Sequence, residues 1–253
     1  HSPNCFLPLR RPCPGVVTVH DLAFEAFPGD FAPRTRMKYQ RLVPLAVRSA
    51  ERVIVPSTFT KDDLVARYGV DDAKVRVIAE APALPGGEGE ASSGDYLLAV
   101  GDLRAKKNLA VLVEAGRRLD MKVVLAGLGD PGPLAAPHVE VTGWVDDERL
   151  DALMRGAAVL VHPSLYEGFG LVLVEAMARG TPVACADATA LPETAAGAAE
   201  LFDPRSAASV AGAIVRAIDR REELAVLGRV RVAELSWERT AAETRAVYDE
   251  VRA

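Results

Sequence analysis

The sequence has few of the features that several classes of protein depend on. Its 253 residues include three cysteines (Cys5, Cys13 and Cys185) and no Cys-x-x-Cys pair. This usage excludes a disulfide framework and a zinc ribbon, and it fits a reducing cytoplasm. No apolar run approaches the roughly 18 residues of a membrane-spanning helix. With 30 Lys and Arg against 35 Asp and Glu, the chain lacks the basic excess of a general nucleic-acid binder.

The first residues also lack an initiator Met, a charged n-region and an apolar h-region, so they do not form a signal peptide. What the chain has is a 49% share of apolar residues, which is enough to bury a sizeable core. Its length allows one large domain or two smaller ones.

Short β-branched runs alternate with longer helical patterns along the chain. This alternation predicts βαβ units around a parallel sheet, and hence an α/β fold. Before residue 80 we expect strands at 16–19, 52–55 and 75–78, with helices at 34–50 and between Ser57 and Gly69. Ser57 is placed as an N-cap and Gly69 as a C-cap.

Residues 81–95 interrupt this alternation, because they are rich in Gly, Pro, Ser and acid and hold almost no large apolar side chain. Such a composition is typical of an interdomain linker, with a surface loop as the alternative. The sequence therefore predicts a smaller, partial α/β domain over residues 1–80 and a complete, doubly wound domain over residues 96–235. A last helix over residues 236–253 is expected to pack back on the first domain.

The second domain is expected to contain five strands and four helices. The strands are placed at 96–100, 122–126, 138–142, 158–162 and 183–186, and the helices at 109–119, 147–155, 170–179 and 206–233. In the final helix, Trp237, Ala241, Tyr248 and Val251 recur at helical spacing, and we expect this stripe to be core.

The most informative segment follows the strand expected at 158–162, where a turn with Gly168 and Gly170 leads into a helix. Glycines let the backbone approach a ligand closely, and the free N–H groups at a helix start favour a phosphate. Ligands of open parallel sheets bind beyond the carboxyl ends of the strands, where this turn lies.

Two carboxylates flank the start of this helix, Glu167 in the turn and Glu175 further along. Ionised carboxylates accept hydrogen bonds from sugar and ribose hydroxyls. The alternative interpretation is a helix-start acid favoured by the dipole at Glu167 and a solvated helix residue at Glu175.

A second loop, residues 101–108, also follows an expected strand and concentrates positive charge in an acidic chain. Its three cations are Arg104, Lys106 and Lys107. A diphosphate requires such a cluster, although a solvated basic loop is commoner in general.

His20 lies at the end of the strand expected at 16–19, where a histidine can act as a base or hold a sugar hydroxyl. A structural histidine is the commoner case, and His162 is expected to be one. The chain has no Asp-x-Asp and no His, Cys and Asp cluster with metal spacing. A metal-dependent sugar transferase of the Asp-x-Asp kind is therefore not expected, and no metal is predicted.

The segment EGFGLVLVE, residues 167–175, resembles the glutamate-x7-glutamate signature of the retaining glycosyltransferases of family 4. AMARGTPV and ALPE follow it in the family's order. TVHDLAFEAFPGDF, VPSTFTKDDLVARYGV and the loop AKKN resemble the matching earlier segments. This ordered set covers essentially the whole chain.

The resemblance implies a GT-B fold, in which two Rossmann-like domains face each other across a cleft. A nucleotide sugar would bind mainly to the second domain, and a glycan, lipid or small-molecule acceptor mainly to the first. Transfer would retain the anomeric configuration by same-face attack without a metal. Catalysis would then rest on positioning and on stabilising the leaving group's charge.

The motif match also implies residue roles. Glu175 would hold the ribose, Glu167 the hydroxyls of the transferred sugar, and His20 would be the family's cleft histidine near that sugar. The remaining donor-binding residues would be Gly101, Arg104, Lys106, Lys107, Gly168, Phe169, Gly170 and Leu171.

The chain departs from the family pattern in two places. Asp102 stands where many members carry Arg, so the cationic role passes to Arg104 and Lys106, as in a branch that often transfers mannose. Guanosine diphosphate mannose is accordingly our first choice of donor. The match also opens partway through the first domain, so we expect that domain to lack its early strands and a glycine-rich loop.

Two other functions compete with a transferase. A non-catalytic nucleotide-sugar-binding remnant would keep the second domain and lose turnover. A Rossmann-type oxidoreductase would need Gly-x-Gly-x-x-Gly after its first strand, and Gly127-Leu128-Gly129 matches it only in part.

The helix expected at 34–50 carries a basic face: Arg34, Arg36, Lys38, Arg41 and Arg48. This face suits an acidic membrane surface at the inner side of the membrane, although a solvated helix face is the commoner explanation.

Overall fold

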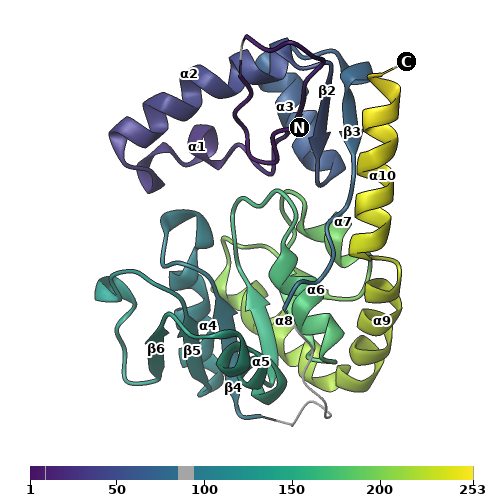
Figure 1. The fold of residues 1–253 in the computed structure, drawn as a ribbon. Helices are drawn as coiled ribbons and strands as arrows, with labels where there is room; N and C mark the ends of the chain where they lie inside the picture. Colours follow the sequence, from purple (N-terminus) through teal and green to yellow (C-terminus); the bar gives the residue numbers. More distant parts are fainter. Residues whose placement is uncertain (9, 85–93, 253) are drawn as a thin grey trace. The chain divides into compact units, whose positions relative to one another are not determined.

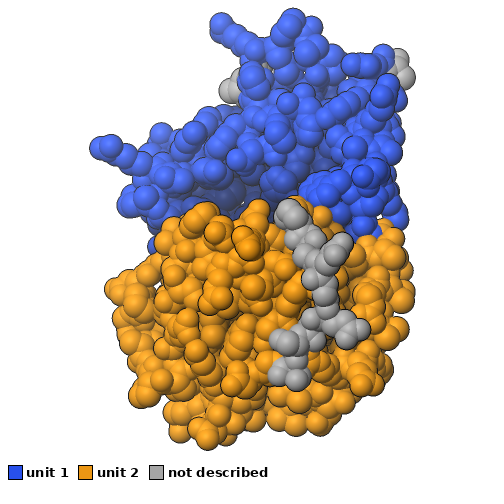
Figure 2. Space-filling view, turned by 60° about the horizontal axis from the view of Figure 1, so that its bottom comes forward, with its two compact units in different colours: residues 1–81, 167–169, 235–253 blue, residues 82–166, 170–234 orange. Residues whose placement is uncertain are grey.

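The computed structural model describes residues 1–8, 10–84 and 94–252, and Figure 1 shows its helices and strands. These residues form two compact units, coloured separately in Figure 2. Unit 1 holds residues 1–81, 167–169 and 235–253, and unit 2 holds residues 82–166 and 170–234. Of the linker predicted over residues 81–95, residues 85–93 lie outside the described part of the chain.

Unit 1 is built on a three-stranded parallel sheet in the order β1-β2-β3. Its elements are β1 (Val16–Thr18), α1 (Ala23–Ala26), α2 (Pro33–Ser49), β2 (Arg52–Val55), α3 (Thr58–Tyr68), β3 (Val75–Val77) and α10 (Trp237–Glu250). The caps of α3 confirm the sequence prediction: the Ser57 side chain accepts from the Thr60 N–H, and Gly69 ends the helix in the left-handed region at φ 62°. The one-turn helix α1 was not expected.

The last helix, α10, lies beside β3 (Figure 1) and is bonded to unit 1 near both of its ends. The Thr240 hydroxyl donates to the Ala79 carbonyl at 2.7 Å. Near the other end, the Glu250 carboxylate pairs with Arg52 and Arg76 at 2.8 and 2.7 Å. These cations lower the pKa of Glu250 to about 2.

The stripe predicted as the core of α10 is wrong at Trp237 and at Ala241, which are both exposed. Trp237 is 44% exposed, and Val247 is the buried residue, packed with Val16, Ile54 and Ile78. Because Thr240 and Val247 are seven residues apart, they share the face that meets the sheet. Trp237 falls on its flank, while Tyr248 and Val251 pack partly against the same cluster.

Unit 2 is built on a six-stranded parallel sheet in the order β6-β5-β4-β7-β8-β9. The strands are β4 (Tyr96–Val100), β5 (Lys122–Ala126), β6 (Val139–Gly143), β7 (Val159–His162), β8 (Val183–Ala186) and β9 (Glu200–Phe202). The short β9 was not expected, because its buried acid Glu200 interrupts the apolar pattern. Glu200 is compensated by Arg216 at 2.7 Å and by Arg220.

The helices of unit 2 are α4 (Leu109–Leu119), α5 (Asp147–Gly156), α6 (Leu171–Ala178), α7 (Leu191–Ala195), α8 (Ala207–Asp219) and α9 (Arg221–Ala233). The single helix predicted over 206–233 is wrong, because the chain turns at Arg220. After this turn the two halves pack on different partners, α8 on α4 and α9 on α6.

The central strands of unit 2 are mostly apolar, and Leu98 in β4 is fully buried. We expect Leu98→Ala to lower the free energy of unfolding by about 2–5 kcal/mol, because the lost side chain leaves a cavity. The matched control is Val226→Ala on the exposed side of α9, which should cost no more than about 0.5 kcal/mol. Urea denaturation followed by circular dichroism measures both, and equal midpoints would contradict this description of the core.

Candidate functional site

The strand order of unit 2 reverses at β4. From β4 the chain proceeds outward through β5 and β6, whereas from the neighbouring β7 it proceeds the other way through β8 and β9. The connections that follow β4 and β7 therefore diverge, and the crevice between such connections is where open parallel sheets bind ligands. The two connections are residues 101–108 and 163–170, which include most of the site residues predicted from the sequence.

One side chain ties these connections together. The Asn108 amide donates to the Pro163 carbonyl at 3.2 Å and to the Pro204 carbonyl at 2.7 Å. A backbone bond from Leu165 N–H to the Lys106 carbonyl, 2.8 Å long, adds a second link. Asn108 itself has a φ of 53°, in the left-handed region that asparagine tolerates better than most residues. The sequence analysis did not single it out.

The basic loop keeps its cations at the mouth of β4. Gly101 has a φ of 127°, and a β-carbon there would lie 3.2 Å from the Lys107 Nζ. The glycine therefore makes room for the Lys107 side chain. Arg104 instead forms an ion pair with Asp102 at 3.0 Å, and both side chains are largely exposed. Asp102 thus offsets part of the charge that the sequence analysis assigned to Arg104.

Glu175 is buried near the middle of α6, not solvated on its surface. Its Oε1 accepts from the Leu84 N–H at 3.2 Å, and burial raises the pKa of the carboxyl although the Leu84 and Ala83 N–H groups oppose this. A carboxylate has about four acceptor positions, so these two backbone N–H groups leave positions for further donors.

Arg179, one turn after Glu175, holds this part of α6 in place through its guanidinium. Its guanidinium, with 1% of the side chain exposed, pairs with Asp151 at 2.6 Å. It also donates to the carbonyls of Glu175 at 2.8 Å and Leu84 at 3.2 Å. Sequence reasoning missed this group, because a charged residue near a helix end gives no signal that it is buried.

The turn Glu167–Phe169 belongs to unit 1 by its contacts. Its Gly168 carbonyl accepts from the buried hydroxyls of Ser57 at 2.6 Å and Thr60 at 3.1 Å. A β-carbon on Gly168 would lie 1.9 Å from the His20 carbonyl oxygen. Only glycine permits this approach, which brings the backbone of His20 beside the turn.

The His20 ring is held at both nitrogens. Nδ1 lies 2.8 Å from the Glu80 carboxylate, and Nε2 lies 2.9 Å from the Pro3 carbonyl. Both partners only accept hydrogen bonds, so a ring that donates from both nitrogens is the protonated form. The bond to Glu80 accordingly raises the pKa of His20. Glu80 was missed, because it lies 60 residues away in the sequence.

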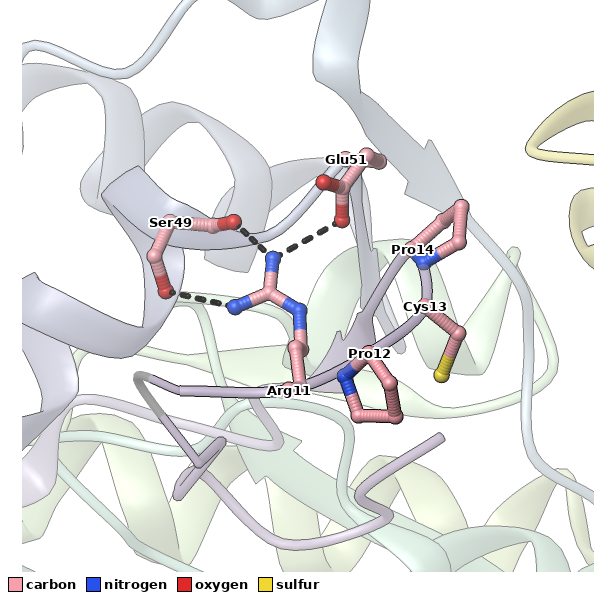
Figure 3. Close-up of a pocket in the computed structure, with 6 residues that line it drawn as sticks. All are labelled: Arg11, Pro12, Cys13, Pro14, Ser49 and Glu51. Atoms are coloured by element: carbon pink, nitrogen blue, oxygen red, sulfur yellow. Dashed lines mark hydrogen bonds and ion pairs between the residues drawn. The ribbon is translucent and has the colours of Figure 1, made fainter.

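His162 and the hollow around Arg11 hold polar side chains that are bonded to other residues of the protein. His162 is buried, with Nε2 3.2 Å from the Ser164 hydroxyl. In the hollow of about 480 Å³ drawn in Figure 3, Arg11 donates to the carbonyl of Ser49 and pairs with Glu51 at 2.9 Å. These bonds attach the N-terminal segment to the turn between α2 and β2.

Comparison with known proteins gives the family. Residues 94–220 match the family model described as Glycosyl transferases group 1, and residues 1–80 match the model described as Glycosyltransferase Family 4. The chain belongs to these glycosyltransferases.

Its relatives include O-antigen chain mannosyltransferase B of Escherichia coli, 26% identical over 98% of this chain and 73% of the relative. Phosphatidyl-myo-inositol mannosyltransferase of Mycolicibacterium smegmatis is 32% identical over 92% of this chain and 63% of the relative. Sucrose-phosphate synthase from Thermosynechococcus elongatus has a TM-score of 0.77 at 25% identity, covering 93% of this chain and 67% of that one. The expected GT-B fold is confirmed, and the chain spans about two thirds of the length of these glycosyltransferases.

The two amide bonds of Asn108 predict a graded loss of stability. Asn108→Gly keeps the left-handed backbone and loses both bonds, so we expect it to cost about 1–2 kcal/mol. Asn108→Ala adds about 1–2 kcal/mol of backbone strain. Urea denaturation of both variants measures these costs, and wild-type stability in both would show that the amide does not hold the connections.

The pairing of His20 with Glu80 predicts a titration. Because the folded pKa of His20 is raised, its stabilising contribution is complete below about pH 6.5 and is lost as the pH rises through the folded pKa. Nuclear magnetic resonance of the histidine rings, assigned with His20→Gln, should give a pKa above 6.5 that falls in Glu80→Gln. Asp62→Asn, on the exposed side of α3, is the control. A His20 pKa that Glu80→Gln leaves unchanged would contradict the pairing.

Proposed function

We propose that the chain transfers a hexosyl group, with mannose as our first choice, from a nucleoside diphosphate sugar to an acceptor hydroxyl. The acceptor class is a glycan, a lipid or a small molecule. One observation carries the proposal. The strand order of unit 2 reverses between β4 and β7, and the cationic loop 101–108 and the helix with the buried Glu175 carboxylate follow these two strands. Family membership supports the reaction class.

The donor's diphosphate suits the mouth of β4. The ammonium groups of Lys106 and Lys107 supply opposite charge there, and the N-terminus of α6 at Leu171 supplies backbone N–H donors. Glu175 would accept from the ribose. Gly170, with a φ of 97°, lets the chain turn into α6 beside the ligand. Glu167, Gly168 and Phe169 would meet the transferred sugar, with Glu167 accepting from its hydroxyls.

The nucleobase has a candidate partner that the sequence analysis did not name. Trp144 follows β6 at the same carboxyl edge of the sheet, and its side chain is 73% exposed. An exposed indole offers a face on which a base can stack. The 2.7 to 3.2 Å bonds of Glu175 and Asn108 hold α6 and the connection after β4, so the rest of the donor would meet fixed groups.

In the proposed reaction the bond between the anomeric carbon and the diphosphate oxygen breaks, and a bond from the acceptor oxygen forms on the same face. The acceptor's proton passes to the departing diphosphate oxygen, so no protein nucleophile and no metal is required. The lysines stabilise the charge that develops on the leaving group. Both ring nitrogens of His20 are already bonded, to Glu80 and to the Pro3 carbonyl, and Glu80 raises the pKa of the ring. We therefore assign His20 a positioning and electrostatic role beside the sugar and not the role of a base.

Mannose comes first because two relatives are named as mannosyltransferases. Asp102, paired with Arg104, also stands where many members carry Arg directly after the loop glycine. The branch that often transfers mannose departs from those members in the same way. The three free cysteines favour a reducing cytoplasm as the cellular location, and none of the described helices is long and apolar enough to cross a membrane. We extend the proposed location to a peripheral position at the inner face of the membrane.

A binding protein without turnover is the second candidate. It is favoured by the size of the first sheet, which has three strands in the described residues against six in the second. Radiolabelled nucleotide sugar separates the two, because a transferase releases nucleoside diphosphate in the presence of an acceptor and a binding protein does not.

We expect one family of nucleoside diphosphates and their sugars to raise the thermal midpoint selectively. A ligand at about 100 times its dissociation constant adds about 2.7 kcal/mol of stability, which a thermal-shift assay detects. Glu175→Ala should lose this shift, since the ribose then has no acceptor, and Lys107→Gln should weaken it through the diphosphate.

The matched control is Glu148→Ala, which removes an exposed carboxylate from α5 and should keep the full shift. A shift that Glu175→Ala retains would remove Glu175 from the donor site. The absence of any shift from a folded sample would reject donor binding altogether.

A further inference from the structure

The outward face of α2 gathers positive charge. The helix Pro33–Ser49 contains five basic residues and no acidic one, in a chain whose net charge is −5. Arg34, Lys38, Arg41 and Arg48 recur at spacings of three, four and seven residues, so they share one side of the helix. All four are exposed, whereas the opposite side buries Val43, Ala46 and Val47 in unit 1. We call these four residues the basic face.

Large apolar side chains lie on the same side. Leu45 is 43% exposed and falls between Arg41 and Arg48, while Met37 and Leu42 are 50% and 38% exposed at its flanks. A merely solvated face would need no such side chains. Basic residues that surround exposed apolar ones are the pattern of a helix lying on a charged lipid surface.

The arginines of this face are not used within the protein. Among the described residues, Arg34, Arg41 and Arg48 have no side-chain hydrogen bond or ion pair, whereas Arg52, Arg76 and Arg117 all pair with acids. Lys38 is the partial exception, with its Nζ 4.6 Å from the centre of the Phe6 ring.

Two acids near α2, Glu25 and Glu51, bond to other residues. Glu25 accepts from Gln40 at 3.0 Å and from Tyr68 at 2.9 Å, and Glu51 pairs with Arg11 at 2.9 Å. Gln40 lies away from the basic face on the helix, so neither Glu25 nor Glu51 is paired with a residue of that face.

We infer that the basic face, with Met37, Leu42 and Leu45, docks on the surface of an anionic lipid bilayer. The arginines and the lysine meet lipid phosphates, and the three apolar side chains enter the boundary between headgroups and acyl chains. A protein of net charge −5 is repelled from such a surface as a whole, so its attachment requires one locally basic patch. This inference deepens the proposed location and does not depend on transferase activity.

The test is cosedimentation of the full chain, without donor, with phosphatidylcholine vesicles that contain or lack phosphatidylglycerol. We expect binding only to the phosphatidylglycerol vesicles at about 0.1 M salt, and weaker binding at higher salt as the charges are screened. Each cation at the surface contributes about fivefold in affinity, so Arg34→Gln/Arg41→Gln/Arg48→Gln should lower the partition coefficient by on the order of a hundredfold.

The matched control is Arg149→Gln/Arg205→Gln/Arg245→Gln, which removes the same charge from three other exposed positions and should leave vesicle binding unchanged. Leu42→Gln/Leu45→Gln should weaken binding at low and high salt alike, because it removes the apolar contact. Circular dichroism checks that each variant is folded.

Three results would overturn the inference: equal binding to both kinds of vesicle, equal losses in the two arginine triples, or capture by soluble RNA or an acidic protein without vesicle binding. Nucleotide binding in the thermal-shift assay should be unaffected by any of these variants. A failure of lipid docking is thereby distinguished from a failure of the proposed donor site.

Discussion

The candidate site depends on one side-chain amide. Strands of a parallel sheet are held by repeated backbone bonds, but the connections at their carboxyl ends have no such ladder. Asn108 supplies the missing constraint in unit 2, because its amide bonds the carbonyls of Pro163 and Pro204, after β7 and β9. The basic loop is thereby held to the first residues of the connection after β7, within unit 2.

A buried ion pair of Arg179 and Asp151 sets the position of Glu175 in the same unit. Arg179 is almost fully buried, and its pairing with Asp151 at 2.6 Å offsets the cost of removing both charges from water. The same guanidinium bonds the Glu175 and Leu84 carbonyls, while the Glu175 carboxylate accepts from the Leu84 N–H. The start of the connection between the units is thereby attached to the helix that carries the proposed ribose acceptor.

Regular apolar patterns made much of the fold predictable. The strands Tyr96–Val100 and Lys122–Ala126 end where the sequence places them, because their apolar runs stop at glycine or polar residues. Where tertiary contacts decide, the pattern fails. The break at Arg220 accompanies different packing partners for α8 and α9, and Val247 is buried because it packs on Val16, Ile54 and Ile78. The GT-B fold was predictable from ordered motifs, whereas the partners of Glu175, Asn108 and His20 are distant in the sequence and carry no local signal.

The central claim is that a nucleotide sugar binds where the connections after β4 and β7 diverge. Hydrogen exchange of the full chain, measured by mass spectrometry with and without saturating guanosine diphosphate mannose, tests this claim directly. The account predicts slower exchange in residues 101–108 and in the backbone from Gly168 to Glu175, and no change in α2. Protection confined to other segments, or no protection with any nucleoside diphosphate sugar, would contradict it.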